Sequence, residues 1–544
     1  MNNDFYIKFN LPIDNTGLPF RAVFPDIKVP FRVEQESERY LLTGYFVSYE
    51  DWLHENNLLT EILANGFKRI VNSNSEFILF LFDKQSRILS VCVDQFFSFA
   101  CYFSVFGDSI AFSSNFSKLK NEVGTRRRLI GDLDGLLTGI LWTWHMTEKT
   151  LIKQIRVVPA GSVVEFDLNN HTSYQIKPLV NVEDYLGLVG EIKYNSLKDF
   201  ASDWVSAVTE IVGRRWSKIP KGVGVGCDIS SGFDCTLIAY CLGKVAGPNA
   251  FTCYSRYSDL MKDETNIEVV RKFSDRHGLT LKSVNATKPQ LRNTNFSKEW
   301  SVDDPWQVAT HEQQIYLDLL KENDVVIDFT GEGGDEAYML KGMELFLRFG
   351  KQYDYFMEVN TLKKYGAGAL FTPRGIDMFL DWDRYNNRIF YPIVVSGSGV
   401  FGTSCSQEQY NSHGLRLMNP FLDTRLISLG RLLPEIPGKA KWDLKLELMK
   451  ELKDIFVDEM FIPKKGSPEH TFVNFATNQR PLIDSVLGSS VLAEIGIIDP
   501  KQIVRLLDNH DSELFKEPNV AIGLETLIKL DWFLQKNNIN QIST

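Results

Sequence analysis

An apolar run that passes directly into a short loop of small and acidic residues occurs twice in this chain, and this feature constrains the fold most. The first run, GVGVGCDI at 222–229, leads into SSGFDC and then into TLIAYCLGKV. This order predicts a buried strand, a tight turn and a helix. The second, VVIDFTGEGGDEAY at 325–338, predicts a strand that ends in a glycine-rich loop.

The segments around these two loops predict the kind of sheet that they belong to. Residues 199–216 carry apolar side chains at helical spacing, FTCYSRY at 251–257 predicts a further strand, and NIEVVRKFSDRHG at 266–278 predicts a further helix. Strands that alternate with helices are typical of a parallel sheet with helical crossovers. From 340 to 544 the pattern is mainly helical.

The first part of the chain has a different pattern, with short alternating segments separated by polar turns. It predicts a layered, β-rich domain with a few helices, and the polar run between 168 and 198 is the best boundary. We therefore expect an α/β and α+β protein of two domains, residues 1–190 and 191–544. The predicted strands of the first domain are FILFLFD at 77–83, ILSVCVD at 88–94, DSIAFSS at 108–114 and SVVEFDL at 162–168.

Composition excludes several classes of protein. The 544 residues are 44% hydrophobic and 24% charged, which is ordinary for a globular chain and unlike a disordered, collagen-like or disulfide-framework protein. Lys and Arg number 59 against 69 Asp and Glu, so the net charge of −10 argues against a general nucleic-acid binder. The 38 Phe residues supply apolar bulk for large cores and could line an apolar substrate channel.

Cysteine usage and the N-terminus indicate a cytoplasmic protein. Seven cysteines, an odd number without a C-x-x-C pair, are expected to be reduced core thiols. The eight histidines lack metal-ligand spacing, so no zinc site is expected. We see no signal peptide in MNNDFYIKFN and no run of about 18 uncharged apolar residues that would predict a membrane span.

The loop at 230–236 has the chemistry of a phosphate-binding turn. Small residues let the backbone approach an anion, and the N-terminus of the following helix supplies free N–H groups. Asp234 is anomalous beside an anion unless it holds Mg²⁺ that bridges to phosphate. The same residues also describe an ordinary strand–turn–helix capped by Ser and Asp. The G-x-x-x-x-G-K spacing of a Walker loop is absent.

The loop at 330–336 carries three glycines and three carboxylates after an apolar strand. Ligands of open α/β sheets bind at the carboxyl ends of the strands, where this loop is expected to lie. Asp234 and Asp335 could then share one Mg²⁺ from opposite sides. The alternative is a solvated acidic turn.

These two loops resemble the S-G-G-x-D-S and G-x-G-x-D-E signatures of the asparagine-synthetase-type, ATP-pyrophosphatase family. A third landmark, R-x-P-F-L-D, is matched by NPFLD at 419–423 without its Arg. The stretch around Lys445, followed by PKKGSP at 463–468, is similar to a fourth. All four occur in family order, and the resemblance implies an ATP-pyrophosphatase α/β domain with a parallel sheet and extra helices.

The N-terminal part resembles the class II glutamine amidotransferase domain, of the Ntn-type αββα fold, that precedes the synthetase domain in this family. The resemblance is carried by SEFILFLFD, by VDQFFSFACYFSVFGDSIAFSSNFSKL and by TEKTLIKQIRVVPAGSVVEFD. The family nucleophile is a Cys directly after Met1, where this chain has Asn2, and the first cysteine is Cys92. Since a thiolate must take the glutamine amide, we expect a scaffold that releases no ammonia.

Loss of the glutaminase nucleophile narrows the resemblance to β-lactam synthetase, carbapenam synthetase and the lasso-peptide cyclases. The C-terminal stretch VLGSSVLAEIGIIDPKQIVRLLDNHD, followed by IGLETLIKLDWFL, is similar to the tail of the lasso-peptide cyclases. This implies a ligase that adenylates an Asp or Glu side chain of a ribosomal core peptide and closes a macrolactam with the peptide's N-terminal amine. The implied cofactors are ATP and Mg²⁺, and a leader peptidase is the implied partner.

The resemblance assigns roles residue by residue. Asp234 and Asp335 would hold Mg²⁺, Lys465 would stabilise the oxyanion and the departing phosphates, and Glu332 would be the base for the amine. The residues expected to bind ATP and pyrophosphate are Ser230, Ser231, Gly232, Asp234, Cys235, Thr236, Gly331 and Gly333. Aromatic residues that could line a peptide cavity, or belong to the core instead, are Trp306, Phe346, Phe349, Phe371, Trp382 and Phe390.

Departures from the family pattern keep alternatives open. Ser231 stands where the family has Gly, Cys235 where Ser is usual, and Lys464 competes with Lys465 for the late lysine. A non-glycine residue at positive φ would be strained. The alternatives are another amide synthetase of the family, such as a β-lactam or asparagine synthetase relative, and a non-catalytic scaffold with a degraded nucleotide site. Lys465 could also be a surface lysine, and Glu332 a structural carboxylate.

Overall fold

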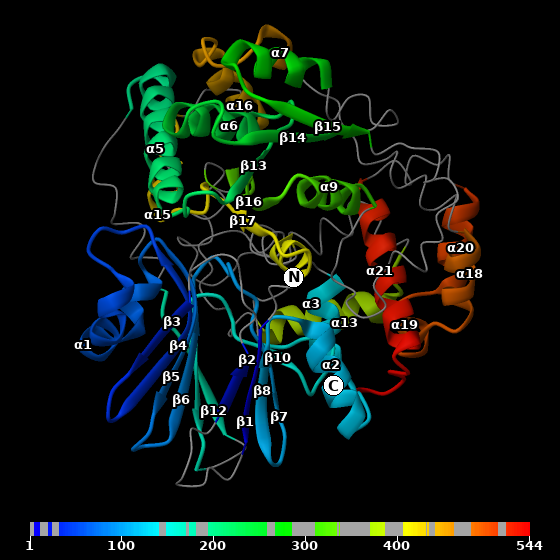
Figure 1. The fold of residues 1–544 in the computed structure, drawn as a ribbon. Coiled ribbons are helices and arrows are strands. Elements are labelled where there is room, and N and C mark those ends of the chain that lie inside the picture. Colours follow the sequence, from blue (N-terminus) through cyan, green and yellow to red (C-terminus); the bar gives the residue numbers. More distant parts are fainter. Residues whose placement is uncertain are drawn as a thin grey trace.

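A computed structural model gives the fold (Figure 1). It describes residues 5–10, 20–23, 32–140, 148–169, 173–180, 194–257, 267–285, 311–334, 337, 370–386, 406–430, 432–434, 441–461, 480–509 and 518–543.

The first part of the chain forms two antiparallel sheets, with strand orders β10-β7-β8-β1-β2 and β12-β11-β6-β5-β4-β3 (Figure 1). All four strands predicted for this part are confirmed, as β5, β6, β8 and β11. The strands are β1 (Tyr6–Asn10), β2 (Phe20–Val23), β3 (Arg32–Glu36), β4 (Tyr40–Ser48), β5 (Ser75–Asp83), β6 (Ile88–Val93), β7 (Tyr102–Val105), β8 (Ser109–Ser113), β10 (Arg156–Val157), β11 (Ser162–Asp167) and β12 (Tyr174–Pro178).

Phenylalanine rings fill the space between these two sheets. Phe80 of β5 meets Phe112 of β8 edge to face, with ring centroids 5.4 Å apart. Phe103 of β7 meets Phe166 of β11 in the same way at 5.2 Å. Edge-to-face pairs add to the free energy of burying the rings, so a share of the high Phe content belongs to this core.

Helices cover the outer sides of the two sheets. Helix α1 (Leu58–Val71) lies beside β3, β4 and β5, and α2 (Phe116–Arg126) and α3 (Leu133–Ile140) lie on the opposite side (Figure 1). Helix α2 begins where the Asn115 side chain accepts a hydrogen bond from the Lys118 N–H at 2.9 Å. Its apolar face then packs on β7 and β8.

The second part of the chain contains a parallel sheet of order β15-β14-β13-β16-β17, as its alternating pattern predicted. Its strands are β13 (Gly224–Asp228), β14 (Thr252–Tyr257), β15 (Leu281–Asn285), β16 (Val325–Phe329) and β17 (Arg416–Met418). The helices around it are α5 (Leu197–Ser217), α6 (Phe233–Ala246), α7 (Ile267–His277), α9 (His311–Glu322), α15 (Thr424–Gly430) and α16 (Lys441–Glu451).

Both faces of the parallel sheet are covered. One apolar cluster joins α5, α6 and α7 to β13 and β14 and includes the buried Trp204. A second cluster joins α9 to the other face through Tyr316, Leu317 and Leu320. Strands buried on both faces read as continuous apolar runs, which is the pattern seen before each glycine-containing loop.

The C-terminal helices pack on the antiparallel part of the molecule. These are α13 (Pro373–Asn386), α18 (Arg480–Gly488), α19 (Val491–Glu494), α20 (Pro500–Asp508) and α21 (Pro518–Lys536). They share one apolar core with the two antiparallel sheets. Strand β18 (Ile542–Ser543) also pairs with β9 (Gly131–Asp132). The predicted boundary at residue 190 therefore separates the antiparallel sheets from the parallel sheet. The C-terminal helices, however, follow this boundary in the chain and pack against the antiparallel sheets that precede it.

Candidate active site

The two loops singled out in the sequence lie side by side. Strands β13 and β16 are parallel neighbours, with Cys227 opposite Phe329, so the loops that follow them leave the same edge of the sheet. A Cβ added to Gly331 would lie 2.4 Å from the backbone nitrogen of Cys235, and one added to Gly334 would lie 2.5 Å from the Asp234 carboxyl carbon. Only glycine permits an approach this close.

The first loop is held by its own polar groups. The Ser230 hydroxyl oxygen accepts from the Gly232 N–H at 3.1 Å, and the Thr236 hydroxyl donates to the Ser230 carbonyl at 2.7 Å. Helix α6 begins at Phe233, so the N–H groups of its first turn are available to an anion. Ser231 is buried and has no positive φ, so serine causes no strain where glycine was expected.

The second loop needs glycine for its conformation. Gly333 has φ of +86°, and a Cβ there would lie 2.5 Å from a methyl carbon of Leu422. The Glu332 N–H donates to the Thr330 hydroxyl at 3.3 Å. In turn, the Thr330 hydroxyl donates to the Asn419 side-chain oxygen at 2.6 Å. The NPFLD landmark therefore supports this loop directly.

Lys445 on α16 reaches into the same site. Its Nζ lies 2.6 Å from Asp234 Oδ2, and both side chains are largely buried, at 16% and 15% exposed. The two residues are 211 positions apart in the chain. The stretch around Lys445 was recognised as a landmark, but Lys445 itself was not among the expected site residues. Its ion pair with Asp234 places a cation beside the loop at 230–236.

A cavity of about 350 Å³ opens between these elements. Six expected residues line it, which are Ser230, Gly232, Asp234, Cys235, Gly331 and Glu332. Ser231, Thr236 and Gly333 are not among its lining residues, and Thr236 is fully buried. Asp335, Lys464 and Lys465 lie outside the described residues, so their predicted roles stay predictions.

Cys235 occupies a position where a hydroxyl was expected. Its thiol lies 3.7 Å from Asp228 Oδ2 and donates to it. Burial, together with the carboxylates of Asp228 and Asp234, raises the pKa of the Cys235 thiol well above its usual range. The raised pKa favours the neutral thiol, which is a small polar neighbour of the loop.

A charge cluster that the sequence pattern did not indicate adjoins the cavity, and all of its members except the fully buried Asp328 line the cavity. We call it the sheet-edge cluster, and it consists of Asp228, Arg256, Tyr316, Asp328 and Tyr410. The hydroxyls of Tyr316 and Tyr410 donate to Asp328 Oδ2 at 3.0 and 2.9 Å, whereas the buried Oδ1 has no hydrogen-bond partner. The signal available in the sequence was an Asp inside each of two otherwise apolar strands.

Electrostatics in the sheet-edge cluster disfavour full ionisation. Burial raises the pKa of Asp328 well above its usual range, and the nearby Asp228 carboxylate raises it further. Burial also raises the pKa of Asp228, which the Arg256 guanidinium partly offsets. Two carboxyls that face one guanidinium can readily hold a proton between them.

The donor set fits Mg²⁺ in part. Magnesium is usually held by one or two carboxylates together with substrate phosphates, and Asp234 could supply one such carboxylate in the loop at 230–236. Within the part of the chain that the structure describes, no three His, Cys, Asp or Glu residues gather as a metal site. Asp234 therefore suits a shared Mg²⁺–phosphate site and not a protein-only cage.

The antiparallel part offers no reactive thiol among its described residues. Cys92 and Cys101 are fully buried, and burial raises the pKa of both thiols well above their usual range. Asn2 lies outside the described residues. Phe371, one of the aromatic residues considered for a peptide cavity, is a core residue that stacks edge to face on Phe379. Trp306, Phe346, Phe349, Phe390 and the side chain of Trp382 lie outside the described residues.

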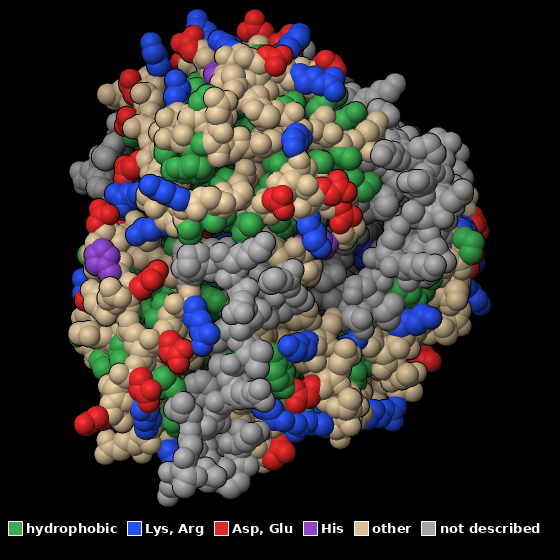
Figure 2. Space-filling view, in the orientation of Figure 1, with side chains coloured by type: hydrophobic (Ala, Val, Ile, Leu, Met, Phe, Trp, Pro, Cys, Tyr) green, Lys and Arg blue, Asp and Glu red, His purple; other side chains and the backbone are tan. Residues whose placement is uncertain are grey.

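The outer surface mixes charges of both signs. Figure 2 shows Lys and Arg side chains interspersed with Asp and Glu over the coloured part of one face. This mixture agrees with the near balance of 59 basic and 69 acidic residues in the chain. In the described ranges, no helix combines the length and the apolar character that crossing a membrane requires.

Comparisons with known proteins give no family. No family model matches the chain, and no curated protein matches it. One similar solved structure is the U34-tRNA thiolase NcsA from Methanococcus maripaludis with its [4Fe-4S] cluster, which is 12% identical over 52% of this chain and 79% of that chain, with a TM-score of 0.22. Another is the glutamine phosphoribosylpyrophosphate amidotransferase from B. subtilis complexed with ADP and GMP, which is 7% identical over 61% and 76%, with a TM-score of 0.20. Neither likeness is strong enough to carry an argument.

Proposed function

We propose that this protein is an ATP-dependent amide ligase that adenylates an Asp or Glu side chain of a core peptide and closes a macrolactam with the peptide's N-terminal amine. The observation that carries this proposal is the meeting of the two loops around Asp234 and Lys445, at the edge of the parallel sheet where ligands of such sheets bind. The order of the four sequence landmarks adds to it.

The phosphate groups of ATP would lie on the first loop. The N–H groups at the start of α6 and the Ser230 hydroxyl would bind phosphate oxygens. Lys445 would turn from Asp234 toward the phosphates and neutralise part of their charge. Mg²⁺, bound by Asp234 and phosphate oxygens, would supply the remaining charge neutralisation. Asp335 and Lys465 complete this set in the proposal.

The reaction would proceed in two balanced steps. A substrate carboxylate oxygen attacks the α-phosphorus of ATP, and pyrophosphate leaves. The amine nitrogen then attacks the acyl carbon, AMP leaves, and the amine proton passes to a carboxylate. Glu332 lines the cavity and is our candidate for this base. Holding amine and carbonyl together is the main gain that such a cavity offers.

We assign the finer fold in keeping with this activity. The antiparallel part would be an Ntn-type αββα domain that has become a scaffold, and the parallel sheet would be an ATP-pyrophosphatase domain. A cytoplasmic location and a leader peptidase that delivers the core peptide belong to the same proposal.

Exchange of labelled pyrophosphate into ATP tests the proposal. The purified protein is incubated with Mg·ATP, labelled pyrophosphate and synthetic peptides that carry a free N-terminus and one internal Asp or Glu. We expect exchange with a subset of these peptides. For these peptides, mass spectrometry should show a product that is lighter than the linear peptide by one water. Exchange with free aspartate and ammonium, and none with any peptide, would favour the asparagine-synthetase alternative. No exchange with either would favour the scaffold alternative.

A further inference from the structure

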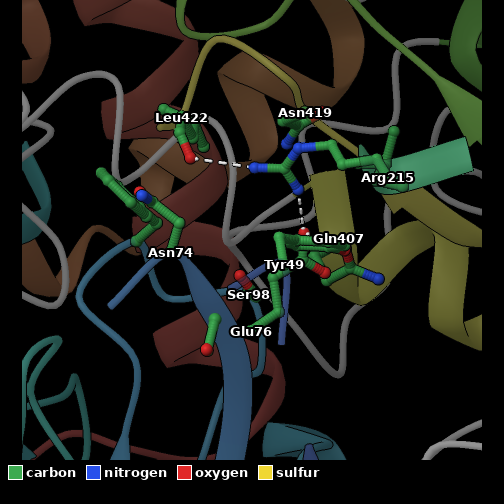
Figure 3. Close-up of a pocket in the computed structure, with 11 residues that line it drawn as sticks. Tyr49, Asn74, Glu76, Ser98, Arg215, Gln407, Asn419 and Leu422 are labelled. Carbon is green, nitrogen blue, oxygen red and sulfur yellow. Dashed lines mark hydrogen bonds and ion pairs between the residues drawn. The ribbon is translucent and has the colours of Figure 1, made fainter. Parts of the chain in front are cut away.

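A buried carboxylate links the antiparallel sheets to the parallel sheet. Glu76 of β5 is 7% exposed and forms ion pairs with Arg215 of α5 and Arg416 of β17. The Tyr49 hydroxyl donates to Glu76 Oε1 at 3.0 Å. We call these four residues the seam cluster. Figure 3 shows Arg215 between Glu76 and the backbone of Leu422.

Both oxygens of the Glu76 carboxylate are paired in the seam cluster. Burial by itself would raise the pKa of Glu76, but the guanidiniums of Arg416 and Arg215 outweigh burial and hold the pKa below its usual value. The Arg215 guanidinium also lies over the Tyr49 ring, 4.3 Å from its centroid. A buried pair of this kind resists rearrangement, because removing one partner leaves an unpaired charge in the interior.

Both arginines hold the chain segment that supports the second loop. Arg215 Nη2 donates to the Leu422 carbonyl at 3.1 Å, and the Leu422 side chain packs directly on Gly333. Arg416 begins β17, three residues before Asn419, the residue that accepts from the Thr330 hydroxyl. The Thr330 N–H also donates to the carbonyl of Met418 at 3.0 Å.

We propose that Glu76 is a positioning residue for the loop at 331–334, so that the antiparallel part of the protein sets the geometry of the cavity through Arg215 and Arg416. The inference rests on the proposed function only for the ligand, Mg·ATP. It gives the antiparallel part a task that needs no glutaminase chemistry, because the contact is made by ion pairs and hydrogen bonds and not by a nucleophile.

The test compares Glu76→Gln with Lys120→Met in the full-length protein. Lys120 is buried and donates to Asn537 at 2.8 Å, so its variant also breaks a contact between early and late parts of the chain, away from 416–422. Amide hydrogen exchange of peptides spanning 329–334 and 415–424 is measured without ligand. Affinity for Mg·ATP is then measured by calorimetry under conditions where both variants are folded.

We expect Glu76→Gln to speed exchange in both peptides and to weaken Mg·ATP binding by about tenfold, which is a typical coupling between sites. Lys120→Met should leave both quantities as in the wild type. Equal exchange and equal affinity in the two variants would overturn the inference. If the wild type binds no Mg·ATP, the proposed function fails, and the exchange measurement still decides whether Glu76 positions the loop.

A triple variant separates positioning from stability. Glu76→Met with Arg215→Met and Arg416→Met removes all three charges and keeps apolar bulk. Replacing a whole buried ion cluster by apolar residues of similar volume often leaves stability unchanged. Methionine cannot donate to the Leu422 carbonyl, so the loop peptides should still exchange faster than in the wild type. Wild-type exchange in this folded variant would mean that Glu76 serves stability alone.

Discussion

Two buried charge clusters in this protein differ in their balance of charge. The seam cluster places one carboxylate between two guanidiniums, whereas the sheet-edge cluster places two carboxyls near one guanidinium. In the first, the pKa of Glu76 is lowered. In the second, the pKa values of Asp228 and Asp328 are raised, and one oxygen of Asp328 has no hydrogen-bond partner.

The difference indicates different tasks. A carboxylate with both oxygens paired stays charged and holds its neighbours in place. A pair of carboxyls with too little positive charge is costly to ionise, and such sites are typical of functional cavities. The seam cluster lies between the antiparallel and the parallel sheets, and most of the sheet-edge cluster lines the cavity beside Asp234. Four substitutions test this contrast.

Removing the seam carboxylate should have the largest effect on stability. Glu76→Gln leaves two buried guanidiniums without their anion, so we expect the free energy of unfolding to fall by about 3–5 kcal/mol. Urea denaturation measures it. The control is Glu34→Gln on β3, whose pair with Arg32 is exposed and should contribute less than about 1 kcal/mol. Similar losses in both variants would contradict the distinction between buried and exposed pairs.

Removing the carboxylate of the loop at 230–236 should act mainly on activity. Asp234→Asn takes away the expected Mg²⁺ ligand and the partner of Lys445, so we expect pyrophosphate exchange to fall by about 10²- to 10³-fold when measured under conditions where the variant is folded. Glu447→Gln, on the same helix as Lys445 and paired with Lys450, is the matched control. Wild-type exchange in Asp234→Asn would show that the metal assignment is wrong.

The sheet-edge cluster should make the free energy of unfolding fall as the pH rises. The folded pKa of Asp328 is raised, so its contribution to stability is present below the unfolded pKa and is lost as pH rises through the folded value. The asparagine side chain in Asp328→Asn does not titrate. The stability of this variant relative to the wild type should therefore increase as the pH is raised from 5 to 8.

Urea denaturation at several pH values checks this expectation. The groups that face Asp328 are Asp228, Arg256, Tyr316 and Tyr410, and they are the same in both proteins. A difference in stability that stays constant or decreases with pH would mean that Asp328 is ionised without cost. Glu76 has the opposite sign, because its lowered pKa makes its contribution fade as pH falls.

The smallest effect is expected at Cys235. Cys235→Ser restores the residue usual in the resembling family and keeps a donor near Asp228. A single neutral hydrogen bond contributes about 0.5–1.5 kcal/mol, so pyrophosphate exchange should change by less than about tenfold. Loss of exchange comparable with that of Asp234→Asn would show that the thiol has a chemical role that its raised pKa does not suggest.

Much of the local structure could be read from the sequence. Short apolar segments bounded by polar turns predicted β5 and β11, and apolar runs that lead into glycine-containing loops predicted β13 and β16. These signals are local, since they depend on burial of one or both faces of a single strand. The sequence indicated that the two loops could meet at the carboxyl edge of a sheet, and the structure makes their strands neighbours.

Contacts between distant segments could not be read in this way. Glu76 is 139 and 340 residues from its two arginines, and Asp234 is 211 residues from Lys445. In the sequence, Glu76 is one acidic residue at the start of an apolar strand. Its burial between two cations depends on the packing of α5 and β17 against β5.

The sequence by itself determined the strand–loop–helix units, the glycines that permit close approach, and the position of a carboxylate in the loop at 230–236, because each follows from local sterics and burial. Only the tertiary structure decided which cation faces Asp234, that the two strand aspartates share one buried cluster, and that the late helices pack on the antiparallel sheets. These outcomes depend on side chains brought together across hundreds of residues, where the free energy of burying each charge is set by its neighbours in space and not by those in the chain.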